Sequence, residues 1–162
     1  MFNDTFDIDI SYTDFDGTSC SLTPQEFVYF CRIADDMRNS IDRWIKIIPD
    51  NHERLKGRSK EALGIFYTSS KEAPFTEDCY ITIDTWFIHE CYMQDVKGTP
   101  SIESQSLVDV IAHELAHSDK FRHCKYHTRL TNLIINAYDT YRETNLVEPF
   151  EDLIQELKKE VK

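Results

Sequence analysis

A segment that is apolar around most of a helical circumference, yet carries two histidines and a glutamate, constrains this chain more than any other feature. Residues 107–117 read Leu-Val-Asp-Val-Ile-Ala-His-Glu-Leu-Ala-His. Apolar side chains at so many successive positions predict a helix that is buried on nearly all sides. Burying a carboxylate and two imidazoles costs free energy unless a cation compensates for them. We therefore expect a helix inside the fold with a metal ion beside it.

The spacing of the polar residues predicts which of them would bind that ion. Residues four apart share one face of a helix, so the imidazoles of His113 and His117 can converge on a single cation. Glu114 lies at the adjoining edge, close enough to take a proton from a water on the metal without being a ligand. This H-E-x-x-H pattern is typical of zinc metallopeptidases. We expect His113 and His117 to bind Zn²⁺ and Glu114 to be the catalytic base.

A catalytic zinc usually has three protein ligands and a fourth position for water, so a third ligand is needed. His123 is the expected one. It follows His117 too late for the same helix, so the helix must end near residues 118–120 and the chain must fold back. Three alternatives remain open for this position: Glu143, which ranks second, and His127 and Cys124.

The flanking sequence predicts an α+β fold with helices on one mixed or antiparallel sheet. Alternating apolar residues indicate a first strand, and a capping box at Thr23 with Pro24 behind it starts a long helix. Strands are predicted at 6–12, 62–68 and 79–84, and helices at 24–48, from 101 or 104 through the histidine pair, at 130–141 and at 150–161.

Composition agrees with a single globular domain over residues 1–162. Hydrophobic residues make up 41% and charged residues 29% of the chain, close to the averages for such domains. The N-terminus lacks the basic and apolar segments of a signal peptide, and no apolar run is long enough to cross a bilayer, so a cytoplasmic location is expected. Five scattered cysteines without a C-x-x-C pair are typical of reduced thiols.

The net charge of −11 disfavours nucleic-acid binding, which needs a basic surface. A short basic cluster, Lys120, Arg122, Lys125 and Arg129, is interpreted as solvated surface. His89 with Glu90 is not a second metal motif, because Met93 stands where another histidine is required. His52, in a polar stretch, is expected to be exposed.

Residues 80–127 resemble the SprT-like and WLM-type zinc metallopeptidases and their YgjP-like relatives. The resemblance rests on the extended segment 80–84, on residues 110–117 as the zincin helix, and on His123 at the place of the third histidine. His127 stands where those families often have phenylalanine. The resemblance implies a small zincin-like domain that hydrolyses peptides or proteins, with segment 80–84 lying along the cleft and pairing with the substrate backbone.

Peptide hydrolysis also needs a donor for the developing oxyanion, and the candidates are Tyr126, His127 and Tyr138. Two other functions stay open. A fourth protein ligand would favour a non-catalytic structural or adaptor domain held together by zinc. A metal-dependent ribonuclease is the other alternative, because the YbeY-like family is similar in placing histidines at the same three relative positions.

Overall fold

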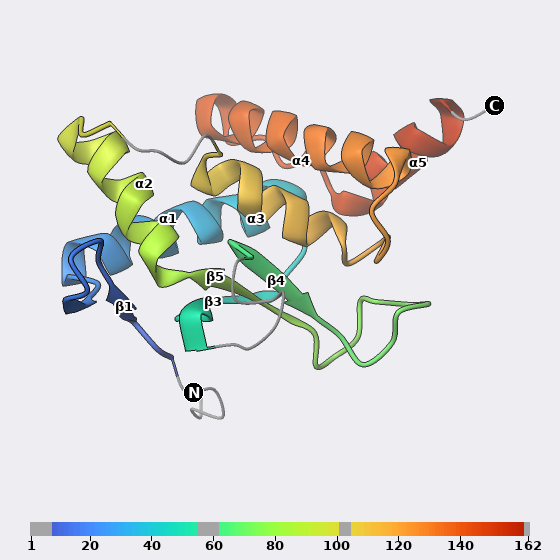
Figure 1. Cartoon of the computed structure of the whole chain (residues 1–162). Coiled ribbons are helices and arrows are strands. Elements are labelled where there is room, and N and C mark those ends of the chain that lie inside the picture. Colours follow the sequence, from blue (N-terminus) through green and yellow to red (C-terminus); the bar gives the residue numbers. More distant parts are fainter. Residues whose placement is uncertain (1–7, 55–61, 101–104, 161–162) are drawn as a thin grey trace.

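The computed structural model describes residues 8–54, 62–100 and 105–160, and its centre is a mixed three-stranded sheet. The strand order is β3 (Lys46–Asp50), β5 (Tyr80–Asp84) and β4 (Gly64–Tyr67). β3 runs parallel to β5 and β4 runs antiparallel to it. β5 is therefore the central strand and β4 an edge strand (Figure 1).

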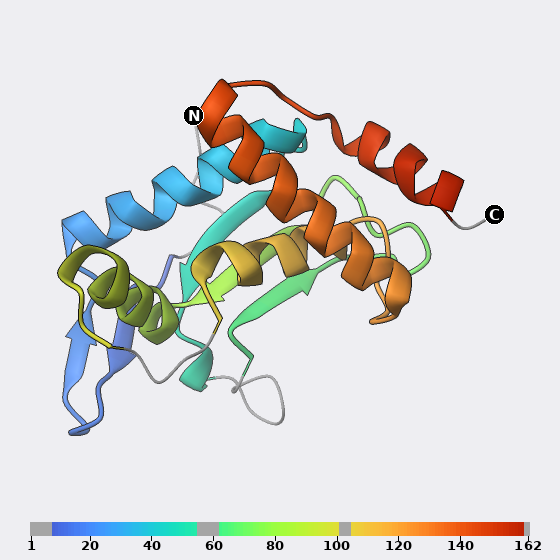
Figure 2. The ribbon, with the colours of Figure 1, turned by 90° about the horizontal axis from the view of Figure 1, so that it is seen from above.

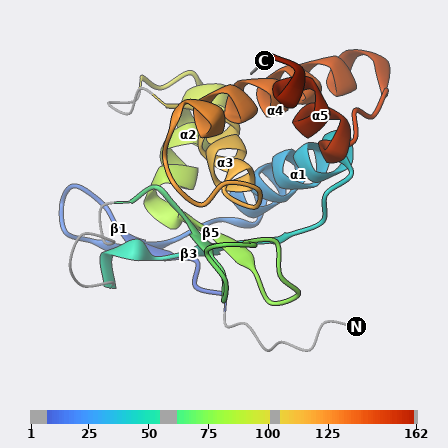
Figure 3. The same ribbon diagram turned by 90° about the vertical axis from the view of Figure 1, so that its right-hand side faces the viewer.

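The helices gather on one side of this sheet (Figures 1 and 3). They are α1 (Pro24–Ile41), α2 (Thr85–Lys97), α3 (Leu107–Ala116), α4 (Lys125–Thr144) and α5 (Phe150–Glu160), with a short 3₁₀ turn η1 (His52–Arg54) beside the sheet. α3 lies between the sheet and α4 (Figure 2). The predicted α+β class with a mixed sheet is confirmed.

The core forms where α3 meets the sheet and the neighbouring helices. Ile81 and Ile83 of β5 are fully buried, and so are Ile111 and Leu115 of α3 and Met37 of α1. Burying side chains of this size is the main source of folding free energy. The prediction that the histidine-bearing helix is buried is confirmed, which fixes its place at the centre of the molecule.

The first helix is shorter than the sequence pattern predicted. α1 ends at Ile41, and Asp42 follows in the left-handed conformation with φ 49°. The predicted helix to residue 48 is wrong, because residues 46–50 form β3. β3 includes Pro49, which it can accommodate because an edge strand has backbone positions that need no donor.

Two further elements were not predicted. α2 follows β5 without a connecting loop, and the Asp84 side chain caps it by accepting a hydrogen bond from the Phe87 amide at 3.3 Å. The other is β2 (Ser19–Ser21), which forms a separate antiparallel pair with β1 (Ser11–Thr13) near the N-terminus. The strand predicted at 6–12 therefore begins later in the part that is described, and residues 6 and 7 lie outside it.

A buried arginine joins three distant parts of the chain. The Arg43 guanidinium lies 3.9 Å from the ring centre of Phe75 and 3.8 Å from that of Phe150. It donates hydrogen bonds to the Ser118 hydroxyl at 3.0 Å and to Glu151 at 3.3 Å. Arg43 thus connects α5 and the loop before β5 to the turn that follows α3.

The five cysteines are free thiols, as predicted. Among the helices of the described residues, none has both the length and the apolar character needed to span a membrane.

Candidate metal centre

The helix that carries the histidines begins and ends with clear local signals. Ser106 caps α3 by accepting a hydrogen bond from the Asp109 amide at 3.0 Å, and Asp109 bonds back to the Ser106 amide. At the other end His117 is the capping residue, and residues 118–120 turn the chain away. The predicted stop near these residues is confirmed, and the turn brings His123 back toward the helix.

Three imidazoles meet at this turn. Nε2 of His123 lies 3.0 Å from Nε2 of His113 and 3.1 Å from Nε2 of His117. Nitrogen ligands about 2.0–2.1 Å from a tetrahedral zinc are themselves roughly 3.3 Å apart. Both distances from His123 are therefore close to the spacing that ligands of one ion require.

A neighbouring carbonyl sets the orientation of the His117 ring. Nδ1 of His117 lies 3.1 Å from the Lys120 carbonyl oxygen, which can only accept a hydrogen bond. The proton of a neutral ring therefore sits on Nδ1, and Nε2 keeps its lone pair. Such a bond from the outer ring nitrogen is typical of metal-binding histidines.

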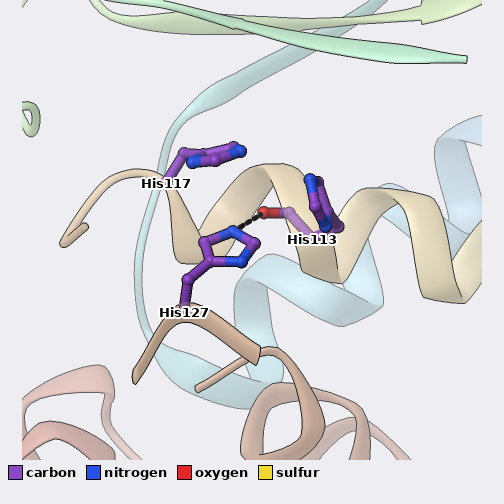
Figure 4. A group of neighbouring side chains, drawn as sticks. All are labelled: His113, His117 and His127. Atoms are coloured by element: carbon purple, nitrogen blue, oxygen red, sulfur yellow. Dashed lines mark hydrogen bonds between the residues drawn. The ribbon is translucent and has the colours of Figure 1, made fainter. Parts of the chain in front are cut away.

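His127, from α4, contacts the same cluster from the side of the helices. Its Nε2 donates to the His113 carbonyl oxygen at 2.9 Å (Figure 4). Its ring stacks on that of His117, with centres 4.2 Å apart, and is almost fully buried. Side-chain nitrogens of His113, His117 and His127 lie within 4.8 Å of one another, so these three histidines could hold a metal ion.

Burial keeps these imidazoles neutral. Desolvation, followed by the neighbouring histidines, lowers the pKa of His113 to about 4. The same main cause lowers the pKa of His117 to about 3, and the pKa of His127 is also lowered. Neutral imidazole is the form that binds metal, so the rings are ready to act as ligands at neutral pH.

Glu114 lies beside the histidines and is itself buried. Desolvation raises the pKa of its carboxyl group to about 8. Gly64 of β4 makes room for it, because a Cβ atom there would lie 2.9 Å from Cγ of Glu114. Gly64 was not predicted as a site residue, because a single glycine at the start of a strand does not indicate a functional site.

Glu114 and the three converging histidines line one cavity of about 1070 Å³. We call it the metal cleft. Its walls are β4 with the two residues before it, α3, and residues 121–123, with Gln105 at one end. The rings of Phe66 and Phe121 lie 6.3 and 6.0 Å from the ring of His117, which makes that end of the cleft partly aromatic.

The strand that was predicted to pair with the substrate is not at an edge of the sheet. Segment 80–84 is β5, which pairs with β3 on one side and β4 on the other, so its backbone is not free to pair with a peptide. β4 occupies the edge beside the metal cleft instead.

The alternative third ligands differ in position. Glu143 lies near the far end of α4, about 24 Å along the helix axis from His127 at 1.5 Å per residue. Cys124 is exposed and directly precedes α4.

The three oxyanion candidates do not line the metal cleft. Tyr126 donates its hydroxyl proton to Asp119 at 2.7 Å, and His127 is bonded to the backbone of α3. Tyr138 is buried and borders a different hollow between α1, α2 and α4.

The remaining two histidines have structural partners. His52 is fully buried, and the prediction that it is exposed is wrong. Its ring nitrogens lie 2.6 Å from the Ala62 carbonyl oxygen and 2.8 Å from the Thr82 hydroxyl, which fixes the chain just before β4. His89 bonds to the buried Glu26 of α1.

No protein-family model, curated protein or solved structure matches this chain. Fold and site together define a small α+β protein with a histidine cluster that could hold a metal ion.

Proposed function

We propose that this protein is a zinc-dependent metallopeptidase in which His113, His117 and His123 bind Zn²⁺ and Glu114 is the catalytic base. The observation that carries the proposal is the meeting of three Nε2 atoms in a cleft that Glu114 also lines. A ring nitrogen carries at most one proton, so His123 Nε2 cannot donate to both partners. A shared cation explains both close approaches.

Two observations favour His123 over His127 as the third ligand. The ring of His127 lies flat against that of His117 rather than pointing at a common centre. His123 is exposed to the cleft that a substrate must enter, whereas His127 does not line it. Three histidines from α3 and the turn after it leave a fourth position facing the cleft.

In this proposal a bound Zn²⁺ supplies a Lewis acid that polarises the substrate carbonyl and activates water. Glu114 takes the proton from the attacking water and passes it to the leaving amine. Burial raises the pKa of Glu114 in the metal-free protein, whereas a cation beside it would favour the carboxylate form that a base needs. The lowered pKa values of His113 and His117 keep their imidazoles in the neutral form that binds zinc.

The edge strand supports a peptide as the substrate. β4 borders the metal cleft and has one side without a partner strand in the described sheet. An extended peptide can add to such an edge through backbone hydrogen bonds. This arrangement would hold the scissile bond over Glu114 and the histidines, and it gives β4 the role that the sequence assigned to segment 80–84.

The central experiment replaces the base and keeps the ligands. Zinc per chain and hydrolysis of an unfolded protein such as casein are measured for the wild type, for Glu114→Gln, and for the exposed Glu143→Gln as a matched control. We expect Glu114→Gln to keep one zinc and lose activity by about 10²- to 10⁴-fold, with Glu143→Gln unchanged. Full activity of Glu114→Gln would refute the mechanism. Cleavage of single-stranded RNA but not protein would favour the ribonuclease alternative.

A closed structural site is the second candidate, and His127 is the observation that favours it. Four imidazoles around the ion would leave no position for water. X-ray absorption of the zinc-loaded protein separates the two cases, because it distinguishes four nitrogen ligands from histidine ligands with an added oxygen. Four imidazoles without activity would establish the structural role.

A further inference from the structure

Among the described residues that line the metal cleft, Arg122 is the one cation. Arg122 is exposed next to His123, and among the residues that the structure describes no ion pair or hydrogen bond engages its side chain. The chain has 29 acidic residues against 18 basic ones, so an unpaired guanidinium at this place departs from the general charge of the molecule.

The sequence around Arg122 is also positively charged. Between residues 119 and 129 the sequence has four cations and a single carboxylate, Asp119, which already accepts the Tyr126 hydroxyl proton. Lys71, from the loop after β4, places its amine 5.4 Å from the ring centre of Phe121, a neighbour of Arg122 that also lines the cleft. The end of the cleft near His117 therefore combines two aromatic rings with the Arg122 guanidinium, and Lys71 lies against one of those rings.

The opposite end of the cleft has a different character. It is bordered by Gln105 and Val110 at the start of α3, which carry no charge. Counting only the residues that the structure describes, a substrate lying along β4 would thus meet positive charge on one side of the histidines. Because a guanidinium can form two parallel hydrogen bonds to a carboxylate, Arg122 would select for that group rather than for any polar side chain.

We propose that the metal cleft takes peptides with a carboxylate beside the scissile bond, held by Arg122 at the Phe121 end. This inference rests on the proposed function for its substrate class, yet binding alone can test it. The carboxylate belongs to an acidic side chain or to the peptide C-terminus, and both have the same chemistry. The basic cluster read as mere solvated surface in the sequence then includes one residue with a specific role.

The test measures binding of short peptides to the zinc-loaded Glu114→Gln protein, in which turnover is blocked. Acetylated and amidated peptides carrying one Glu are compared with the same peptides carrying Gln, and a third set has a free C-terminal carboxylate. We expect the preferred carboxylate peptide to bind about tenfold more tightly than its neutral partner, as one charged hydrogen-bonded contact typically provides. The set that shows the preference identifies the source of the carboxylate.

Two further substitutions in that background isolate Arg122. Arg122→Gln should abolish the preference, while Arg129→Gln, an equal change of charge on the exposed face of α4, should preserve it. A carboxylate that only chelates zinc would bind equally well to both variants, which would overturn the proposal. Equal binding of Glu and Gln peptides, or no binding of either, would also overturn it. Tight Arg122-dependent binding without cleavage by the wild type would instead contradict the peptidase function.

Discussion

Gly64 and Glu114 face each other across the metal cleft, and their contact sets the position of the carboxylate. A Cβ atom at residue 64 would lie 2.9 Å from Cγ of Glu114 and 2.9 Å from Cγ1 of Val110. Both neighbours belong to a buried, closely packed helix that has little room to retreat. The site therefore requires that residue 64 of β4 has no side chain.

We expect Gly64→Ala to lower peptidase activity by at least about tenfold, because small displacements of a catalytic group are costly. Zinc content should stay at one per chain. Gly98→Ala is the control, since Gly98 has φ 73° and open space around it, so its substitution strains the backbone at the end of α2, outside the lining of the cleft. If Gly98→Ala lost as much activity as Gly64→Ala at equal stability, the steric explanation would fail.

The histidines differ in their expected contributions to zinc affinity. Replacing His123 by Ala removes a ligand, whereas replacing His127 by Phe keeps a ring against His117 and removes only the bond to the His113 carbonyl. We expect His127→Phe to weaken zinc binding by about 10- to 100-fold and His123→Ala by much more. Competition with a chelating dye measures both, with Glu143→Ala as an unaffected control. Equal losses for His123 and His127 would show that both are ligands.

At the scale of elements, local sequence signals predicted most of the fold. The capping box at Thr23, the apolar periodicity of α3 and the aromatic run of β4 each act within a few residues, and each element is found. The helix predicted through residue 48 failed because the left-handed turn at Asp42 depends on β3 pairing with a strand more than thirty residues away. Long-range pairing of this kind leaves no mark in a local pattern.

Some residues of the candidate site could be predicted from the local sequence and others could not. The spacing of His113, Glu114 and His117 is a property of one helix, and the position of His123 follows from a short turn. Gly64 and His127 come from other elements, and only the packing of α3 between β4 and α4 brings them to the site. The choice of β5 as substrate strand failed because strand order is decided by the whole sheet.

The edge strand has its own prediction. Amide hydrogen exchange is measured for the zinc-loaded Glu114→Gln protein with and without a bound peptide. We expect protection to increase within residues 64–66, because β4 is an edge of the described sheet and would gain backbone hydrogen bonds there. Residues 80–84 should be protected in both states, since β5 is paired on both sides. Binding that leaves exchange in β4 unchanged would place the peptide elsewhere.

At the scale of the whole molecule, the buried carboxyl group makes the stability of the metal-free protein depend on pH. The pKa of Glu114 is raised from 4.5 to about 8 in the folded state, so folding favours its protonated form. The stability that this form provides is complete below about pH 4.5 and is lost as the pH rises to 8.

We therefore expect Glu114→Gln to stabilise the metal-free protein at pH 8, by up to a few kcal/mol, and to have little effect near pH 4.5. Urea unfolding of the wild type and the variant at both pH values, with zinc removed, measures the difference. The comparison cancels the contribution of the histidines, which both proteins share. A difference that grew toward acid pH would have the wrong sign for a buried carboxyl group.

The Arg43 contacts have a consequence for how a distant change could reach the metal centre. Phe150 and Glu151 belong to α5, and through Arg43 they hold Ser118, the residue directly after His117. Apart from His117, none of these residues lines the metal cleft. A change that displaces α5 would therefore be passed through one guanidinium to the turn behind the histidines, although no described residue of α5 lines the cleft.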